Sequence, residues 1–248
     1  MYKLVTFDIY ETLLKTRKPL GEMYMQASKS FGICGVRPDV LAASFKTQWI
    51  IMCRTHPNFG LHSGLGWEVW WKNIVRNTFL NSTNEKINIE SLDQLSLYLI
   101  DLFSTKNGWT YEDGAVDLLK YLASCKMQMG VISNFDPRLR SILKELNLSN
   151  YFSFILTSYE TSYTKPDINI FKIAQRTYEN QNGFQLEETK ALHVGNSLEH
   201  DVLGARNAGW NAALISNKEK LESYRNEKRT MLFKNLYELK NYFAFSLR

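Results

Sequence analysis

The chain has 248 residues, of which 44% are hydrophobic and 22% are charged, and this composition excludes a disordered or fibrous protein. Its net charge of +5 is spread along the sequence without a dense basic block, so we predict a solvated surface and no nucleic-acid partner. No apolar run approaches the ~18 residues that a membrane span requires, so no membrane association is predicted.

The cysteines are Cys34, Cys53 and Cys125. They are far apart and odd in number, which fits neither a disulfide framework nor a zinc spacing. We therefore expect buried or half-buried thiols in a reducing compartment. The first predicted strand begins almost at the first residue and leaves no room for a targeting peptide. The expected location is cytoplasmic.

The first predicted element is a short buried strand over residues 4–7, which are apolar and β-branched. Asp8 follows it directly, and a polar turn starts at Glu11. Asp8 therefore stands at the carboxyl end of a strand, which is where ligands bind in open α/β sheets. A carboxylate at this place is a nucleophile, a metal ligand or a helix cap.

Residues 18–108 show helical periodicity and no strand runs. Apolar spacing predicts four helices, over 20–31, 40–52, 67–79 and 92–102. The third of them carries Trp67, Trp70 and Trp71. We predict that these rings belong to the core of a helix bundle, because large aromatic side chains at helical spacing dominate such cores.

From residue 109 onward, apolar strands alternate with amphipathic helices. The predicted strands cover 128–132, 154–157, 191–194 and 212–215, and helices are predicted after residues 114 and 137, over 168–178 and over 198–208. Residues 217–229 are predicted to be exposed, and 232–245 form either a strand or a helix. The pattern predicts an α/β fold with a doubly wound, mainly parallel sheet.

Small polar groups follow four of these strands. In chain order they are Asp8, then Ser133 with Asn134, then Lys165, then Asn196 with Asp201. Because the carboxyl ends of parallel strands share one edge of a sheet, we expect these side chains to meet there.

This ordered set of Asp, Ser, Lys and Asn/Asp resembles the four motifs of the haloacid dehalogenase-like (HAD) hydrolase superfamily. The segments 17–22, 59–61, 132–136 and 156–158 are most similar to one branch, the haloacid dehalogenase-like hydrolase domain-containing protein 3 group. The resemblance covers nearly the whole chain. It implies a Rossmann-like HAD core over 1–17 and 109–248, with an all-helical cap domain inserted at 18–108.

The resemblance also implies roles for individual residues. Asp8 would be the nucleophile and Lys165 would neutralise the charge that gathers beside it. The groups that bind a small anionic substrate would be Thr12, Ser133 and Asn134. A Mg²⁺ cofactor would be held by Asp8, by the backbone carbonyl of Tyr10, and by Asn196 or Asp201, since oxygen ligands suit this ion.

Two residues depart from the pattern of the family's phosphatases. Tyr10 stands where they carry the Asp that protonates the leaving alcohol, and a phenol is a poor acid at neutral pH. Asn196 stands where most of them carry Asp, which removes a negative charge and weakens Mg²⁺ binding. True haloacid dehalogenases also carry Tyr and Asn at these places, because a halide leaves without an acid or a metal.

Three interpretations therefore remain open. The chain is a weak or specialised Mg²⁺-dependent phosphatase-type hydrolase, a metal-independent 2-haloacid dehalogenase, or a non-catalytic protein that binds a ligand, or a protein partner through its cap. We expect Glu11 to face solvent or a cap salt bridge, because its side chain alternates away from Asp8. His193 is expected to be a hydrogen-bonded core residue, and Asp136 a helix cap.

Overall fold

The computed structural model describes residues 1–216 and 230–246. The chain separates into two compact units. We call Met1–Lys15 with Tyr111–Arg248 the sheet unit, and Thr16–Thr110 the helical unit. The sequence pattern predicts the corresponding limits at 17/18 and 108/109.

A parallel sheet forms the centre of the sheet unit. Within the described residues it has six strands in the order β5-β4-β1-β6-β7-β8. Every neighbouring pair in it runs parallel. The strands are β1 (Leu4–Phe7), β4 (Gln128–Ser133), β5 (Phe154–Thr157), β6 (Ala191–Gly195), β7 (Asn211–Ile215) and β8 (Thr230–Phe233). The predicted α/β fold with a parallel sheet is confirmed.

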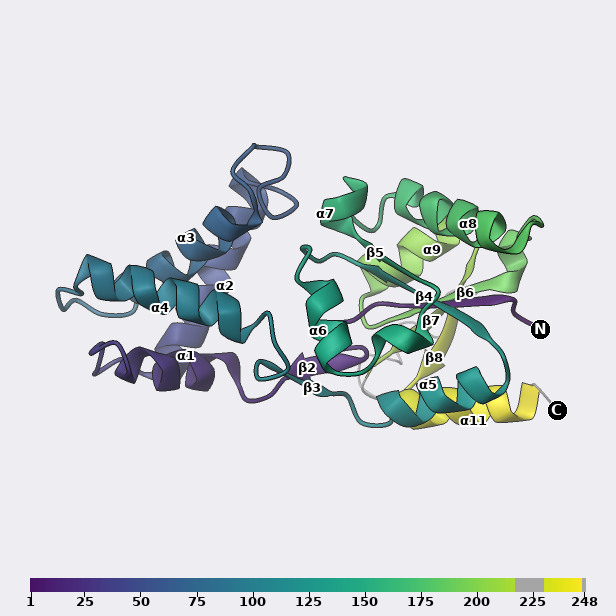
Figure 1. Cartoon of the computed structure of the whole chain (residues 1–248), viewed down its shortest axis with the longest axis horizontal. Coiled ribbons are helices and arrows are strands. Elements are labelled where there is room, and N and C mark those ends of the chain that lie inside the picture. Colours follow the sequence, from purple (N-terminus) through teal and green to yellow (C-terminus); the bar gives the residue numbers. More distant parts are fainter. Residues whose placement is uncertain (217–229, 247–248) are drawn as a thin grey trace. The chain divides into compact units, whose positions relative to one another are not determined.

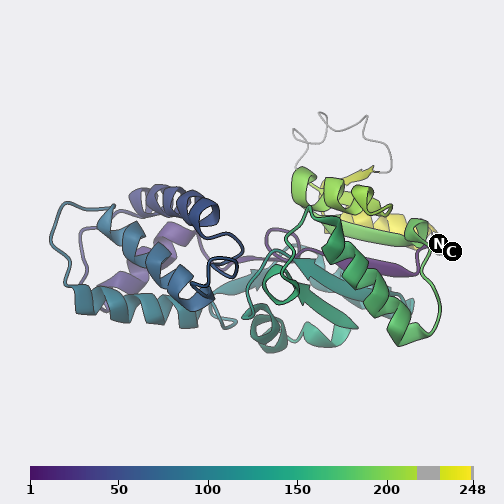
Figure 2. The same ribbon diagram turned by 90° about the horizontal axis from the view of Figure 1, so that it is seen from above.

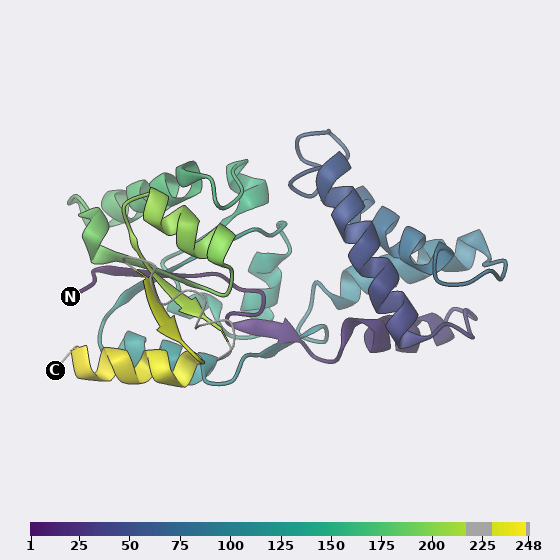
Figure 3. The same ribbon diagram turned by 180° about the vertical axis from the view of Figure 1, so that it is seen from behind.

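Helices cover both faces of this sheet, with α8 and α9 on one face and α5 and α11 on the other (Figures 1 and 3). The α- and π-helices among the described residues of the unit are α5 (Ala115–Ser124), α6 (Leu139–Glu145), α7 (Ser158–Thr161), α8 (Ile168–Asn182), the π-helix η3 (Leu198–Leu203), α9 (Gly204–Asn207) and α11 (Leu236–Ser246). Two single-turn 3-10 helices, η1 (Ser149–Tyr151) and η2 (Glu188–Lys190), lie between them. Strands buried on both sides explain why β1 and β6 read as nearly continuous apolar runs.

The structure resolves two ambiguous segments of the sequence pattern. The predicted helix 198–208 is made of η3 and then α9, so its first part has π geometry. Residues 232–245, predicted as a strand or a helix, contain both: the end of β8 and most of α11. The exposed stretch predicted at 217–229 lies outside the described residues.

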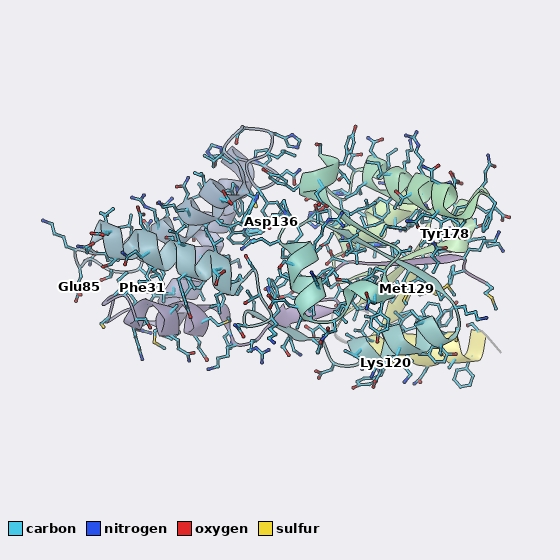
Figure 4. All side chains as sticks on the ribbon, viewed as in Figure 1. Phe31, Glu85, Lys120, Met129, Asp136 and Tyr178 are labelled. Carbon is cyan, nitrogen blue, oxygen red and sulfur yellow. The ribbon has the colours of Figure 1, made fainter. Side chains whose placement is uncertain are left out.

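One side of the sheet packs on α8 through a continuous apolar cluster. Its members include Phe154 of β5, Phe171 and Tyr178 of α8, and Trp210 before β7; Tyr178 is labelled in Figure 4. A side chain at Gly130 of β4 would overlap the Phe154 ring, so only glycine lets that ring pack against the sheet. This packing holds β4 and β5 in register.

The helical unit contains α1 (Leu20–Lys29), α2 (Pro38–Thr55), α3 (Trp67–Leu80) and α4 (Ile89–Leu102) (Figure 2). Trp70 is buried, and its ring lies 5.3 Å from Trp49 and 5.1 Å from both Phe59 and Trp71, centroid to centroid. These edge-to-face contacts stabilise a bundle core. Trp70 is therefore a core residue, as predicted, whereas Trp67 and Trp71 are only half-buried.

The thiols differ from expectation. All three cysteines are free and exposed, where the sequence led us to expect buried or half-buried side chains. The reason is local: Cys53 lies on the outward side of α2, and Cys125 ends α5 at the surface.

Two short strands that the sequence did not predict carry the chain between the units. They are β2 (Leu14–Thr16) and β3 (Trp109–Tyr111), and they form a separate two-stranded sheet. The backbone amide of Glu112 donates to Leu13 at 2.9 Å, and that of Arg17 donates to Gly108 at 3.0 Å. The chain therefore enters and leaves the helical unit side by side.

None of the helices in residues 1–216 and 230–246 is long and apolar enough to cross a membrane.

Candidate active site

The topology of the sheet places the candidate residues at one edge. From β1 the chain passes to β4 and β5 on one side, and then returns to β6, β7 and β8 on the other. The carboxyl ends of β1, β4 and β6 therefore meet at a topological switch point, which is the ligand site of open α/β sheets. Asp8, Ser133 and Asn196 stand at these three strand ends.

Asp8 is held through one of its two carboxylate oxygens. Its Oδ1 accepts a hydrogen bond from the Ser133 hydroxyl at 2.9 Å and another from Lys165 Nζ at 2.8 Å. Its Oδ2 takes part in none of the hydrogen bonds of the described residues, and the side chain remains 12% exposed. One oxygen is thus fixed and the other is open.

Lys165 lies between two carboxylates. Its buried Nζ donates to Asp8, to the carbonyl of Ile132 at 2.8 Å and to Asp201 Oδ1 at 2.6 Å. Burial by itself would lower the pKa of Lys165, but the charges of Asp201 and Asp8 outweigh it and raise that pKa. The ammonium is therefore charged at neutral pH with all three protons engaged.

Asn134 fixes the backbone of Lys165. Its Oδ1 accepts from the Lys165 amide at 2.7 Å and its Nδ2 donates to the Lys165 carbonyl at 3.0 Å. The sequence predicts a substrate-binding role for Asn134, and the structure shows that both ends of its amide contact the loop before α8. Ser133, predicted to bind the same anion, directs its hydroxyl at Asp8.

Asp201, on η3, is the second buried carboxylate of the site. In addition to Lys165, its Oδ1 accepts from His193 Nε2 at 3.1 Å, and its Oδ2 accepts from the backbone amide of Ser197 at 2.9 Å. Burial opposes ionisation of this carboxyl, yet the adjacent Lys165 charge and the His193 hydrogen bond lower its pKa. Asp201 is an anchor for Lys165, and both of its oxygens already have donors.

Gly195 makes room for this carboxylate. A Cβ on Gly195 would overlap the Asp201 side chain. Replacing Gly195 with Ala is therefore expected to cost about 1–3 kcal/mol of unfolding free energy, which is typical of overpacking a filled site. Urea unfolding measures this change.

The cause of that cost can be checked with a double-mutant cycle. In an Asp201→Gly background the Cβ, Cγ and Oδ2 atoms that the added methyl group would overlap are all absent, so Gly195→Ala is expected to cost much less. An equal cost in both backgrounds would contradict the assigned clash.

The turn after Asp8 forms the rim of the site. The amides of Leu13 and Leu14 both donate to the Ile9 carbonyl, at 3.0 and 2.9 Å, which closes the turn. Glu11 takes a left-handed backbone conformation with φ 57°. Its Oε2 accepts from Asn196 Nδ2 at 3.3 Å.

Glu11 is exposed, as expected, but its contact with Asn196 was not predicted. Side-chain alternation applies to extended strands, and a left-handed residue breaks it. The Glu11 carboxylate consequently contacts Asn196 at the end of β6. Thr12 is buried, and its hydroxyl donates to Asn196 Oδ1 at 3.4 Å.

Tyr10 is partly exposed beside this turn. Burial of part of its ring, together with the nearby carboxylates of Glu11 and Glu112, raises the pKa of Tyr10 to about 12. The phenol is thus an even weaker acid than an isolated tyrosine, and it remains neutral at physiological pH.

Asp136, labelled in Figure 4, lies in the loop between β4 and α6. It accepts from the Arg138 backbone amide at 3.0 Å and forms a buried, bidentate pair with the Arg138 guanidinium at 2.8 and 2.7 Å. Asp136 therefore shapes the turn before α6. Its predicted role as the helix cap is wrong, because the N-cap residue of α6 is Arg138, without a side-chain cap hydrogen bond, and the Asp136 carboxylate is engaged by the Arg138 guanidinium.

Most of the residues predicted from the strand ends are linked by hydrogen bonds in the sheet unit. The contacts join Asp8, Ser133, Asn134, Lys165 and Asp201, and a second group joins Thr12, Asn196 and Glu11. Two residues of the site were not predicted to act in it: Glu11 and His193. The signal for His193 was a polar residue on an otherwise apolar strand, opposite Thr6 on the neighbouring strand.

The parallel sheet and the site at its switch point define an α/β enzyme-type fold with a buried carboxylate–ammonium–carboxylate centre. The model of the haloacid dehalogenase-like hydrolase family matches residues 2–209, and the chain belongs to that family.

Relatives with similar sequences support this assignment. The chain is 36% identical over 223 residues to the Rhythmically expressed gene 2 protein of Drosophila melanogaster, covering 88% of this chain and 84% of the relative. It is 33% identical over 216 residues to the haloacid dehalogenase-like hydrolase domain-containing protein 3 of Xenopus laevis, covering 87% and 85%.

Solved structures share the fold at low sequence identity. The HAD-hydrolase YfnB of Bacillus subtilis, bound to magnesium, matches with a TM-score of 0.68 and 17% identity over 98% of this chain and 99% of its own. The 2-haloacid dehalogenase of Pseudomonas syringae pv. Tomato matches with a TM-score of 0.65 and 20% identity over 99% and 100%.

Proposed function

We propose that this chain is a hydrolase that uses Asp8 as its nucleophile on a small phosphate ester, with the help of Mg²⁺. The observation that carries the proposal is the unequal use of the two Asp8 oxygens. Oδ1 is fixed by Ser133 and Lys165, while Oδ2 has no hydrogen bond among the described residues and the side chain is still reached by solvent. A carboxylate held in this way is oriented for attack.

The proposed reaction has two steps. First, Asp8 Oδ2 forms a bond to phosphorus while the bond from phosphorus to the ester oxygen breaks, which gives an aspartyl phosphate and the leaving alcoholate. Then water hydrolyses the aspartyl phosphate and restores the carboxylate. Lys165 orients Asp8 before attack and offsets the charge near it in both steps.

The oxygen atoms at the rim fit a hard cation. The Tyr10 carbonyl and Asn196 Oδ1 would hold Mg²⁺ together with water molecules, as this ion prefers, and Asp8 would contribute through the carboxylate oxygen that does not attack. When bound, Mg²⁺ would offset the negative charge of the phosphoryl oxygens. Asp201 is a weaker candidate than Asn196, because its two oxygens together accept three short hydrogen bonds, whereas Asn196 Oδ1 accepts one long bond of 3.4 Å from Thr12.

Some features support this assignment, and others favour an alternative. The chain belongs to a hydrolase family, and the solved YfnB structure with the same fold is bound to magnesium. The weak acid Tyr10 and the neutral Asn196 favour instead a metal-independent 2-haloacid dehalogenase, whose fold is also similar. We favour the phosphatase, because the Asn196 amide meets the additional carboxylate of Glu11 at the rim.

One pair of assays separates the candidates. The purified chain is expected to hydrolyse p-nitrophenyl phosphate with added Mg²⁺ and to lose this activity in excess chelator. Halide release from 2-chloropropionate that continues in chelator would establish the dehalogenase instead. No turnover in either assay would leave a binding protein.

The leaving-group acid can be restored by design. Tyr10→Asp places a carboxyl group where the phenol now stands, and general acid catalysis contributes about 10²–10⁴-fold. The variant is expected to raise kcat for an alkyl phosphate at least tenfold, and to change kcat for p-nitrophenyl phosphate little, because nitrophenolate leaves without a proton. Parallel initial-rate measurements on both esters check this.

The matched control is Tyr10→Asn, which has a similar shape but no acid. An equal gain for Asp and Asn, or an equal gain on both esters, would contradict the role assigned to this position.

A further inference from the structure

His193 occupies a specific place in the sheet. It is fully buried on β6, and its register partner on β1 is Thr6. Residues two apart in a strand face the same side, so Thr6 shares its side with Asp8, and His193 shares its side with Gly195. The imidazole therefore lies in the layer beneath the reacting carboxylate, with the Phe171 ring packed edge-on at 5.3 Å.

Both ring nitrogens of His193 are engaged. Nδ1 lies 2.8 Å from the Thr6 hydroxyl, and Nε2 lies 3.1 Å from Asp201 Oδ1. An ionised carboxylate accepts only, so Nε2 carries the hydrogen and Nδ1 accepts from Thr6. The two contacts together fix one tautomer and one ring orientation.

The arrangement matters because two carboxylates share one ammonium. Lys165 Nζ is 2.6 Å from Asp201 and 2.8 Å from Asp8. The same Asp201 oxygen accepts from Lys165 and from His193. Without the His193 donor, Asp201 could turn about its side-chain bonds and draw Lys165 away from Asp8.

We propose that His193 is a positioning residue, which anchors Asp201 so that Lys165 stays on Asp8. The connected order is Thr6, His193, Asp201, Lys165 and Asp8. The effect on turnover rests on the proposed hydrolase function, whereas the structural effect does not. An apolar residue would fill the same space in a strand at lower desolvation cost, so the polar ring is accounted for by this anchoring.

Three variants test the proposal. His193→Met keeps much of the volume and removes the donor. His193→Gln keeps an amide N–H near the place of Nε2. Leu192→Val is the control, since Leu192 is also buried on β6 but faces the opposite side of the sheet. For each, kcat and KM on p-nitrophenyl phosphate, urea unfolding and a crystal structure are measured.

We expect His193→Met to lower kcat about tenfold with KM unchanged, the size of one lost hydrogen bond to a charged group. Its crystal structure should show Lys165 Nζ beyond hydrogen-bond distance of Asp8. His193→Gln should restore most of kcat and the contact, and Leu192→Val should retain both. If Met and Gln lower kcat equally, or if Lys165 keeps its contact in the Met variant, the proposal is overturned.

The contacts proposed for His193 can be tested without an activity assay. In the unaltered protein, ¹⁵N NMR of the histidine side chains should show His193 protonated at Nε2, and Thr6→Val should shift its Nδ1 signal. A proton on Nδ1 would overturn the proposal even in an active enzyme. If the unaltered chain hydrolyses no substrate, the proposed function fails, and the NMR and crystallographic results still decide the role of His193. If His193→Met does not fold, Thr6→Val takes its place in the same comparison, with an expected kcat loss of about threefold.

Discussion

Replacing Asp8 with Asn is expected to lower kcat for p-nitrophenyl phosphate by at least ~10³-fold, the order of effect seen when a nucleophile is removed. The amide has nearly the same shape as the carboxylate, but its oxygen is a poor nucleophile. Lys165 keeps its contacts with Asp201 and the Ile132 carbonyl, so the fold is expected to survive. Purified Asp8→Asn is assayed at the same Mg²⁺ concentration as the unaltered chain.

The control is Asp117→Asn, an exposed carboxylate on α5. It should leave kcat unchanged, and circular dichroism should confirm that both variants are folded. Substantial residual hydrolysis by Asp8→Asn would show that another group performs the attack.

Lys165→Met is expected to affect both stability and catalysis. It leaves Asp8 and the buried Asp201 without their shared cation, and breaking a buried ion pair from one side typically costs about 3–5 kcal/mol. Turnover should also fall steeply, because among the described residues only the Ser133 hydroxyl then holds Asp8 Oδ1. Urea unfolding at neutral pH measures the loss of stability.

The pH dependence of this loss has a definite sign. In the unaltered chain the pKa of Asp201 lies below its usual value, so its contribution to stability is present above the ordinary carboxyl range and is lost as pH falls. In Lys165→Met only hydrogen bonds oppose the effect of burial on Asp201, so the pKa of Asp201 should rise. Protonation of Asp201 as the pH falls should then stabilise the folded state of this variant. The difference in stability between the two proteins is therefore expected to narrow between pH 7 and pH 4.

A second substitution separates charge from packing. Removing the Asp201 charge in Lys165→Met/Asp201→Asn should recover part of the lost stability, because one uncompensated buried carboxylate is gone. If the double variant is no more stable than Lys165→Met, the cost comes from the missing side-chain volume of the lysine and the electrostatic account is wrong.

The sequence predicts the parallel sheet and the strand ends well because each depends on short-range pattern. Apolar runs of four to six residues followed at once by Asp8 or Ser133 fix both the strand and the place of its end. The position of Lys165 was less direct, since it comes from a loop after β5 and reaches Asp8 only through its long side chain.

Partners within the site could not be predicted in the same way. Asn134 contacts the Lys165 backbone with both ends of its amide, because a loop distant in sequence folds against it. Glu11 contacts Asn196 because its backbone is left-handed. A glutamate rarely adopts this conformation, and no pattern of side chains in the sequence predicts it. His193 reaches Asp201 because η3 starts right after β6, and Gly195 leaves room for the carboxylate.

The paired strands β2 and β3 have a consequence for how this molecule can vary. Backbone hydrogen bonds between Glu112 and Leu13, and between Arg17 and Gly108, join the two segments that lead into and out of the helical unit. The sheet unit therefore depends on these short paired segments and not on the length of chain between them. Insertions, deletions or wholesale exchange within residues 18–107 can therefore accumulate without disturbing the strand that ends at Asp8. Such modularity lets the helical unit diverge in sequence and length while the sheet unit keeps its fold.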